Sequence, residues 1–114
     1  MAIATLGHVE LLCPNLEESR DHFHDIAGLE ESFREDGKIY MRAWGDWSAY
    51  TLILTEAETN GVGHVAFQTE SADDLETYAE RIEASGYSVE WHDAGTEPKH
   101  GEAIRFTSPA DFEF

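Results

Sequence analysis

The sequence predicts an α+β fold made of two βαβββ units, and an internal repeat is the main reason. Gly7-His8-Val9 recurs as Gly63-His64-Val65, an offset of 56 positions, and each copy opens an apolar run typical of a strand. An N-capping residue follows each run at the same offset, Asn15 in the first copy and Ser71 in the second. A length of 114 residues is that of one domain. We therefore expect a single domain over residues 1–114, with units at about 1–57 and 58–114 and an open cleft in a curved mixed sheet.

The first unit opens with a strand over residues 7–12, which Pro14 ends because proline has no N–H to donate to a ladder. Asn15 and Glu18 match a capping box for a helix that runs to about residue 27 and stops at a glycine. We expect Leu16, Phe23 and Ile26 to form the apolar face of this helix. Three further strands are predicted over 29–36, 38–43 and 50–56, the first two joined by a tight Asp36-Gly37 turn.

The second unit repeats this plan. A strand over 63–69 precedes a helix that Ser71 and Asp74 cap and that Gly86 ends. Leu75, Tyr78 and Ile82 share one face of that helix. Three more strands are then predicted over 87–92, 102–107 and 111–114, with a loop over 93–101 between the first two.

The charge is strongly acidic, with 24 Asp and Glu against 7 Lys and Arg and a net charge of −17. Nucleic-acid binding is disfavoured because phosphates would be repelled. Disorder is disfavoured, since the apolar periodicity is clear and 11% of the residues are aromatic. An acidic cleft for a cationic ligand remains open. Adaptation to high salt fits best, because molar salt screens self-repulsion over about 3 Å.

Three features that the sequence lacks indicate the cellular compartment of the protein. No run of about 20 apolar residues is present, so we expect no membrane span. The first residues have neither the basic nor the apolar region of a signal peptide. Cys13 is the one cysteine and cannot form an internal disulfide, as is usual in a reducing cytoplasm. We therefore expect a cytoplasmic protein.

Two histidines, His8 and His64, stand at the same place in the two copies. Related units tend to pair face to face, so two equivalent histidines on paired strands predict the start of a metal site. The alternative is that both are ordinary histidines of core strands. Trp44 and Trp47, in the loop "AWGDWS", either line a cleft for an aromatic ligand or pack within their own loop.

The segments "GHVEL", "NLEESRDHFHDIAGLE", "IYMRAWGDW", "GHVAF" and "HGEAIRFTSP" resemble the vicinal oxygen chelate superfamily of glyoxalases, bleomycin-resistance proteins and extradiol dioxygenases. The chain is most similar to the N-terminal domain of a catechol 2,3-dioxygenase. The resemblance implies a divalent metal, Fe(II) or else Mn or Zn, held by His8, His64 and Glu113. It also implies a small catecholic ligand and either a homodimer or docking to a second domain of the same kind.

The sequence also departs from the pattern of the family's catalytic domains. Tyr50 stands where those domains place an acid/base histidine, and Arg105 stands where they place a tyrosine. The last turn is shortened before Glu113. His100 resembles a lid histidine near the substrate, the alternative being an exposed loop residue, so His100 and Tyr50 are the catalytic candidates. Three functions remain open: an extradiol dioxygenase-like domain, a non-catalytic N-terminal half, and a metal-free module that binds small molecules, as drug-resistance relatives do.

Overall fold

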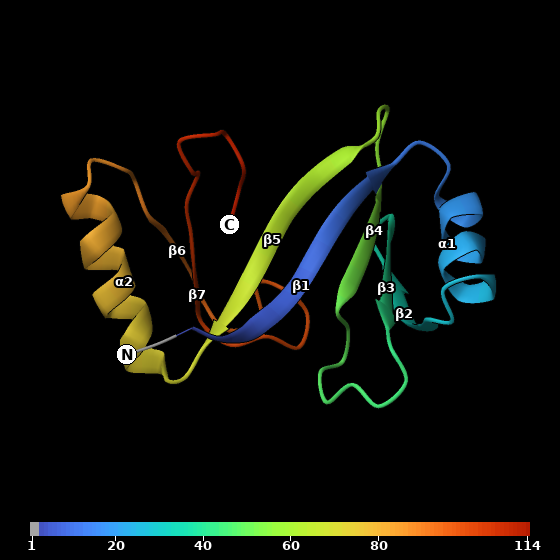
Figure 1. The fold of residues 1–114 in the computed structure, drawn as a ribbon, viewed down its shortest axis with the longest axis horizontal. Helices are drawn as coiled ribbons and strands as arrows, with labels where there is room; N and C mark the ends of the chain where they lie inside the picture. The colour runs from blue at the N-terminus through green and yellow to red at the C-terminus, as the bar shows by residue number, and fades with distance from the viewer. Residues whose placement is uncertain (1–2) are drawn as a thin grey trace. The chain divides into compact units, whose positions relative to one another are not determined.

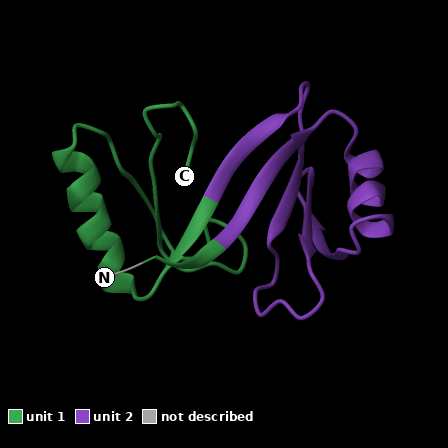
Figure 2. Cartoon of the chain, viewed as in Figure 1, with its two compact units in different colours: residues 1–6, 66–114 green, residues 7–65 purple. Residues whose placement is uncertain are grey.

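The computed structural model describes residues 3–114, which form a mixed α+β fold with two helices and a five-stranded sheet (Figure 1). The predicted fold class is therefore confirmed. The chain divides into two compact units (Figure 2): unit 2 is Gly7–Val65, and unit 1 combines the residues up to Leu6 with residues 66–114. Met1 and Ala2, the first residues of the predicted domain and of the segment tested for a signal peptide, lie outside the described residues.

Unit 2 is organised on the five-stranded sheet, in the order β2-β3-β4-β1-β5. β1 runs parallel to β4, with Val9 opposite Leu52, whereas β3 is antiparallel to both β2 and β4. β5 lies beside β1 and runs in the opposite direction (Figure 1). The elements are β1 (Ile3–Cys13), α1 (Leu16–Asp25), β2 (Glu30–Glu35), β3 (Lys38–Arg42), β4 (Leu52–Glu56) and β5 (Gly61–Thr69), of which β1 and β5 continue past the boundary of the unit.

Local signals in unit 2 act largely as the sequence predicts. The side chain of Asn15 accepts a hydrogen bond from the Glu18 backbone N–H at 3.1 Å, which caps α1. Asp36 and Gly37 have φ angles of 50° and 74°, so both central residues of the hairpin between β2 and β3 adopt the left-handed conformation of a type I′ turn. This turn sets the register that pairs Glu35 with Lys38.

The core of unit 2 lies between α1 and the sheet. Cys13, Ile39, Met41 and Leu54 are buried together, and Leu16, Phe23 and Leu29 pack against them. The prediction that Ile26 belongs to this apolar face was wrong, because Ile26 is 76% exposed. The helix ends at Asp25, and Ile26 is its C-cap, so the side chain lies beyond the turn that covers the sheet.

Unit 1 contains α2 (Ala72–Ala84), β6 (Glu90–His92) and β7 (Ala103–Arg105), with β6 and β7 paired antiparallel. The Asp74 carboxylate accepts from the Ser71 N–H at 3.1 Å, as expected of the capping box. The three strands predicted over 87–92, 102–107 and 111–114 are shorter than expected. The last is reduced to one bridge between Thr107 and Glu113. Alternation of apolar and polar residues had suggested longer strands, but β6 and β7 pair over three residues only.

Candidate metal centre

Two buried histidines meet on neighbouring strands of unit 2. His8 comes from β1 and His64 from β5, and their Nε2 atoms are 2.9 Å apart. The rings are nearly perpendicular, at 88°, and the two residues are 2% and 6% exposed. Such burial removes most competition from water for these nitrogen atoms. The repeat therefore places two strong metal-ligand groups in direct contact within one unit.

Glu10 links this pair to the rest of the sheet. It follows His8 by two positions on β1, and side chains two apart in a strand lie on the same face. Glu10 Oε1 lies 3.1 Å from His64 Nδ1, and Oε2 accepts from Lys38 Nζ at 2.9 Å and from Thr55 Oγ1 at 2.7 Å. These hydrogen bonds hold the pKa of the Glu10 carboxyl well below its usual value, and the bond from His64 has the largest effect. Burial of the carboxyl opposes the shift.

The hydrogen bonds define the tautomers of both rings. An ionised carboxylate only accepts, so His64 Nδ1 carries a proton and donates it to Glu10. A neutral His64 ring accepts at Nε2, and the 2.9 Å contact then pairs it with an N–H on His8 Nε2.

The residues present fit a divalent metal ion. Imidazole nitrogen suits Fe and Zn, and with bonds of about 2.1 Å two nitrogens in adjacent positions on one ion stand about 3 Å apart. The Nε2 separation of 2.9 Å is close to that value. Two histidines are part of the ligand set of non-haem iron sites, which add one carboxylate.

Tyr50, one of the two catalytic candidates, lies in an aromatic cluster of unit 2. Its side chain is fully buried, and its ring centroid is 4.7 Å from that of Tyr40 and 5.4 Å from that of His8. Phe33 packs edge-on against it at 5.8 Å. This environment favours packing over exchange of protons with solvent.

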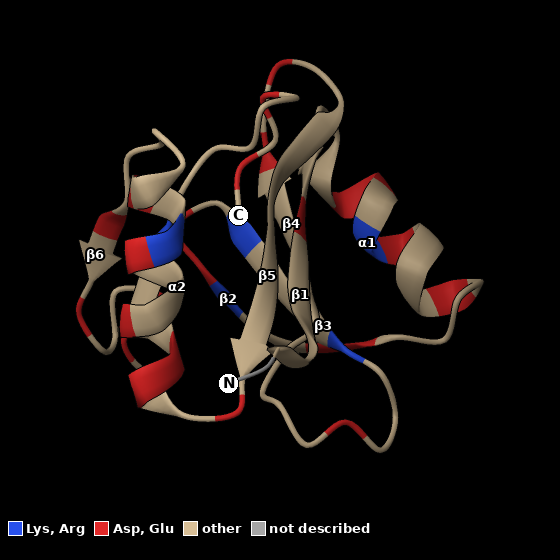
Figure 3. Cartoon of the chain, turned by 60° about the vertical axis from the view of Figure 1, so that its left-hand side comes forward, with Lys and Arg blue, Asp and Glu red and all other residues tan. Residues whose placement is uncertain are grey.

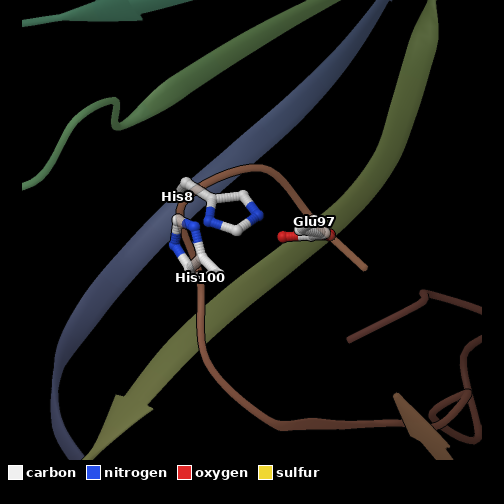
Figure 4. Close-up of side chains that lie close together, drawn as sticks. All are labelled: His8, Glu97 and His100. Atoms are coloured by element: carbon white, nitrogen blue, oxygen red, sulfur yellow. The ribbon is translucent and has the colours of Figure 1, made fainter. Parts of the chain in front are cut away.

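The remaining candidates belong to unit 1. Glu113 Oε1 is 3.8 Å from Arg105 Nε, and Arg105 Nη2 donates to Glu97 Oε1 at 3.0 Å. His100 lies on the loop between β6 and β7, where its Nδ1 is 3.1 Å from the Pro98 carbonyl oxygen. Figure 4 shows the side chains of Glu97 and His100 on this loop, with His8 on β1; all three are of types that ligate metals. The roles of Glu113 and His100 stay predictions.

The two tryptophans of the loop before β4 are exposed. Trp44 is 89% exposed and Trp47 is 104% exposed. Packing within their own loop, one of the two alternatives, is therefore wrong. The loop is instead tied by Asp46, whose carboxylate accepts from the Ala43 N–H and from Thr51 Oγ1. This contact spans the loop without using either indole.

Glu10 is the residue of this centre that sequence reasoning missed. It was interpreted only as one of many acidic residues, yet its spacing from His8 was a usable signal. A carboxylate two positions from a buried strand histidine shares its face. Gly63, directly before His64, fits the same arrangement, since a Cβ at this position would lie 2.0 Å from Glu10 Oε1.

Comparisons with known proteins agree with this architecture. A family model described as the catechol 2,3-dioxygenase-like N-terminal domain matches residues 62–114. The chain is 46% identical over 112 residues to the manganese-dependent 2,3-dihydroxybiphenyl 1,2-dioxygenase of Geobacillus genomosp. 3, covering 98% of this chain and 36% of that protein. It is 39% identical over 107 residues to a metapyrocatechase of Geobacillus stearothermophilus, covering 94% and 32%. The crystal structure of the 2,3-dioxygenase LapB from Pseudomonas sp. KL28 superposes with a TM-score of 0.93 at 27% identity, covering 99% and 40%.

The fold and these relatives define a vicinal oxygen chelate domain of the extradiol dioxygenase kind. More particularly, the chain belongs with the N-terminal domains of catechol 2,3-dioxygenase-like proteins. It spans about a third of the length of the curated relatives it matches. Within residues 3–114, no helix has the length and apolar character needed to cross a membrane.

Proposed function

We propose that this chain serves as the N-terminal domain of a larger extradiol dioxygenase that cleaves a catecholic ring. The support comes from relatives named as a 2,3-dihydroxybiphenyl 1,2-dioxygenase and a metapyrocatechase, which extend well beyond the matched region. The resemblance to these enzymes implies that the chemistry takes place in a second domain. The domain described here then has a binding or structural role. Its site residues are therefore tested first for binding.

We further propose that His8 and His64 bind a divalent metal ion, Fe(II) or Mn(II), with Glu113 as the carboxylate ligand taken from the family pattern. The observation that carries this proposal is the 2.9 Å contact between two buried Nε2 atoms. A metal bound there would supply a Lewis acid and a template for a catechol and dioxygen. The chain's part is to hold both imidazoles in a buried, preformed pair.

Mn(II) binding to the full chain tests the metal proposal. Loss of the free-ion electron paramagnetic resonance signal reports binding, and His8→Ala and His64→Ala are each expected to abolish it. His24→Ala, at an exposed position of α1, is the matched control and is expected to bind as the unaltered chain does. Binding that is unchanged in both buried variants would contradict the proposal. Absence of Mn(II) binding to the unaltered chain would instead favour the metal-free module, which the direct hydrogen bond between the two rings also allows.

Three broader expectations belong to the same proposal. Asp and Glu residues recur along both helices (Figure 3), which supports function at high salt. The single Cys13 is buried and free, as is usual in a cytoplasmic protein. The resemblance implies contact between two like domains, so we propose a homodimer or docking to a second like domain. X-ray scattering that gives the mass of a monomer at molar salt would contradict the dimer.

A further inference from the structure

We infer that Glu10 is a positioning residue for His64: it fixes the tautomer and the ring orientation that present His64 Nε2 to a metal ion. The inference rests on the proposed binding of a metal by His8 and His64. It extends that proposal by naming the group outside the ligand set that prepares one ligand. Metal-ligating histidines in proteins usually donate their other ring N–H to such a carboxylate.

The first support is that Glu10 is itself held in place. Lys38 and Thr55 stand opposite each other on β3 and β4, and both donate to Glu10 Oε2. The other oxygen, Oε1, is thereby left for His64 Nδ1. Because the carboxylate is fixed from two further strands, it can fix the ring rather than follow it.

The second support is the glycine next to His64. A Cβ at Gly63 would lie 2.0 Å from Oε1, 2.6 Å from Cδ and 2.9 Å from Cγ of Glu10. Gly63 does not have the positive φ that would by itself require glycine. Its missing side chain instead gives room for the carboxylate to approach the strand. The sequence of β5 is thus adapted to the close approach of Glu10.

The consequence for metal binding follows from the two tautomers of imidazole. With Nδ1–H pointing at Glu10, the lone pair of His64 lies on Nε2, the atom that faces His8. Without the carboxylate, the Nε2–H tautomer competes and the lone pair moves to Nδ1, away from His8. Loss of such a supporting carboxylate typically weakens metal binding by about 10- to 100-fold.

The experiment compares Glu10→Gln, Glu10→Ala and the unaltered chain by two readouts. Titration with Mn(II) is expected to show affinity about 10- to 100-fold weaker in both variants. Long-range ¹H–¹⁵N spectra of the metal-free protein are expected to show Nδ1–H for His64 in the unaltered chain and a shift toward Nε2–H in Glu10→Ala. Glu35→Gln, at an exposed end of β2, is the control and should change neither readout.

The outcomes separate this inference from the metal proposal. If the unaltered chain binds no Mn(II) but His64 is Nδ1–H and shifts in Glu10→Ala, positioning holds and the metal proposal fails. If the unaltered chain binds Mn(II) while both Glu10 variants bind equally well and keep the tautomer, the inference is overturned. Should Glu10→Ala fail to fold, Lys38→Met leaves the carboxylate in place without its cation and is expected to weaken Mn(II) binding by a smaller factor.

Discussion

His8 Nε2 and His64 Nε2 are in hydrogen-bond contact at 2.9 Å, although the two residues are 56 positions apart in the chain. The contact exists because β1 and β5 are neighbours in the sheet and each carries its histidine at the equivalent place of the repeat. Two side chains that share a buried proton in this way hold each other's orientation. The same two nitrogen atoms would become a pair of ligands if a metal ion displaced the shared proton to solvent.

We expect Gly63→Ala to destabilise the protein by about 1–3 kcal/mol, the usual cost of forcing extra volume into a packed site. The added Cβ would lie 2.0 Å from Glu10 Oε1, so the carboxylate has to leave His64, Lys38 or both. Urea unfolding followed by circular dichroism measures the change.

The control for this prediction is a glycine on the same strand. A Cβ at Gly61 would lie 3.5 Å from Leu12 Cδ1, an ordinary contact, so Gly61→Ala should be nearly neutral. Combining Gly63→Ala with Glu10→Ala should cost less than the sum of the two single changes, because the clash is then absent. Strict additivity would show that the crowding at Gly63 has another origin.

Fold prediction from the sequence succeeds where a short sequence pattern specifies the local backbone conformation. Asp36-Gly37 defines a type I′ turn and hence the register of β2 and β3, and Asn15 defines where α1 begins. Prediction of the strands was less successful over residues 87–114. Strand alternation says which residues face the same way, but not whether a partner strand is present to pair with them. Ile26 was misplaced for a related reason, since the end of a helix depends on where the chain must turn next.

Site prediction reached the two histidines through the repeat but not the carboxylate that contacts Nδ1 of His64. With 24 acidic residues in the sequence, composition alone gave no reason to single out Glu10. What distinguishes Glu10 is its burial and its donors on β3, β4 and β5, which come from distant positions. Tertiary pairing therefore supplies the information that a single strand lacks.

We expect the melting temperature to rise between low salt and molar KCl. Glu76, Glu80 and Glu83 lie three and four positions apart on exposed turns of α2, so like charges repel along the helix. Molar salt screens this repulsion. Differential scanning calorimetry across a KCl series measures the effect. Changing all three residues to Gln should make the melting temperature less dependent on KCl concentration. A melting temperature of the unaltered chain that does not change with salt would contradict the prediction.

We expect Arg34→Gln to reduce the loss of stability in acid. Arg34 and, more weakly, Arg20 donate to the Glu31 carboxylate and hold its pKa below the usual range. A lowered pKa in the folded state contributes stability that is complete above the unfolded pKa of about 4.3 and is lost as the pH falls through the folded value. Urea midpoints between pH 6 and pH 3 measure this loss.

The matched control is Arg81→Gln, which removes the same charge from an exposed position on α2. Its pH profile should follow that of the unaltered chain in shape. The Arg34→Gln profile should be shallower below about pH 4.3, because Glu31 then titrates closer to its unfolded value. Parallel profiles for all three proteins would show that the Glu31 contacts contribute nothing measurable, as is true of many surface ion pairs.

Finally, we expect this chain alone to cleave catechols slowly or not at all, even when loaded with Fe(II). Ring cleavage needs a group that moves protons, and such a group usually contributes about 100- to 10,000-fold. The family slot for that group holds Tyr50, which is fully buried against Tyr40, and a phenol with an ordinary pKa of about 10 is a poor base near neutrality. Arg105, in the other slot, is a guanidinium that donates to Glu97 and cannot act as a base.

The test is to load the chain with Fe(II) without oxygen and then add catechol and air. The absorbance of the yellow ring-opened product measures the rate of cleavage. Turnover of about 1–1,000 per second that His64→Ala abolishes would place a working catalytic site in this domain.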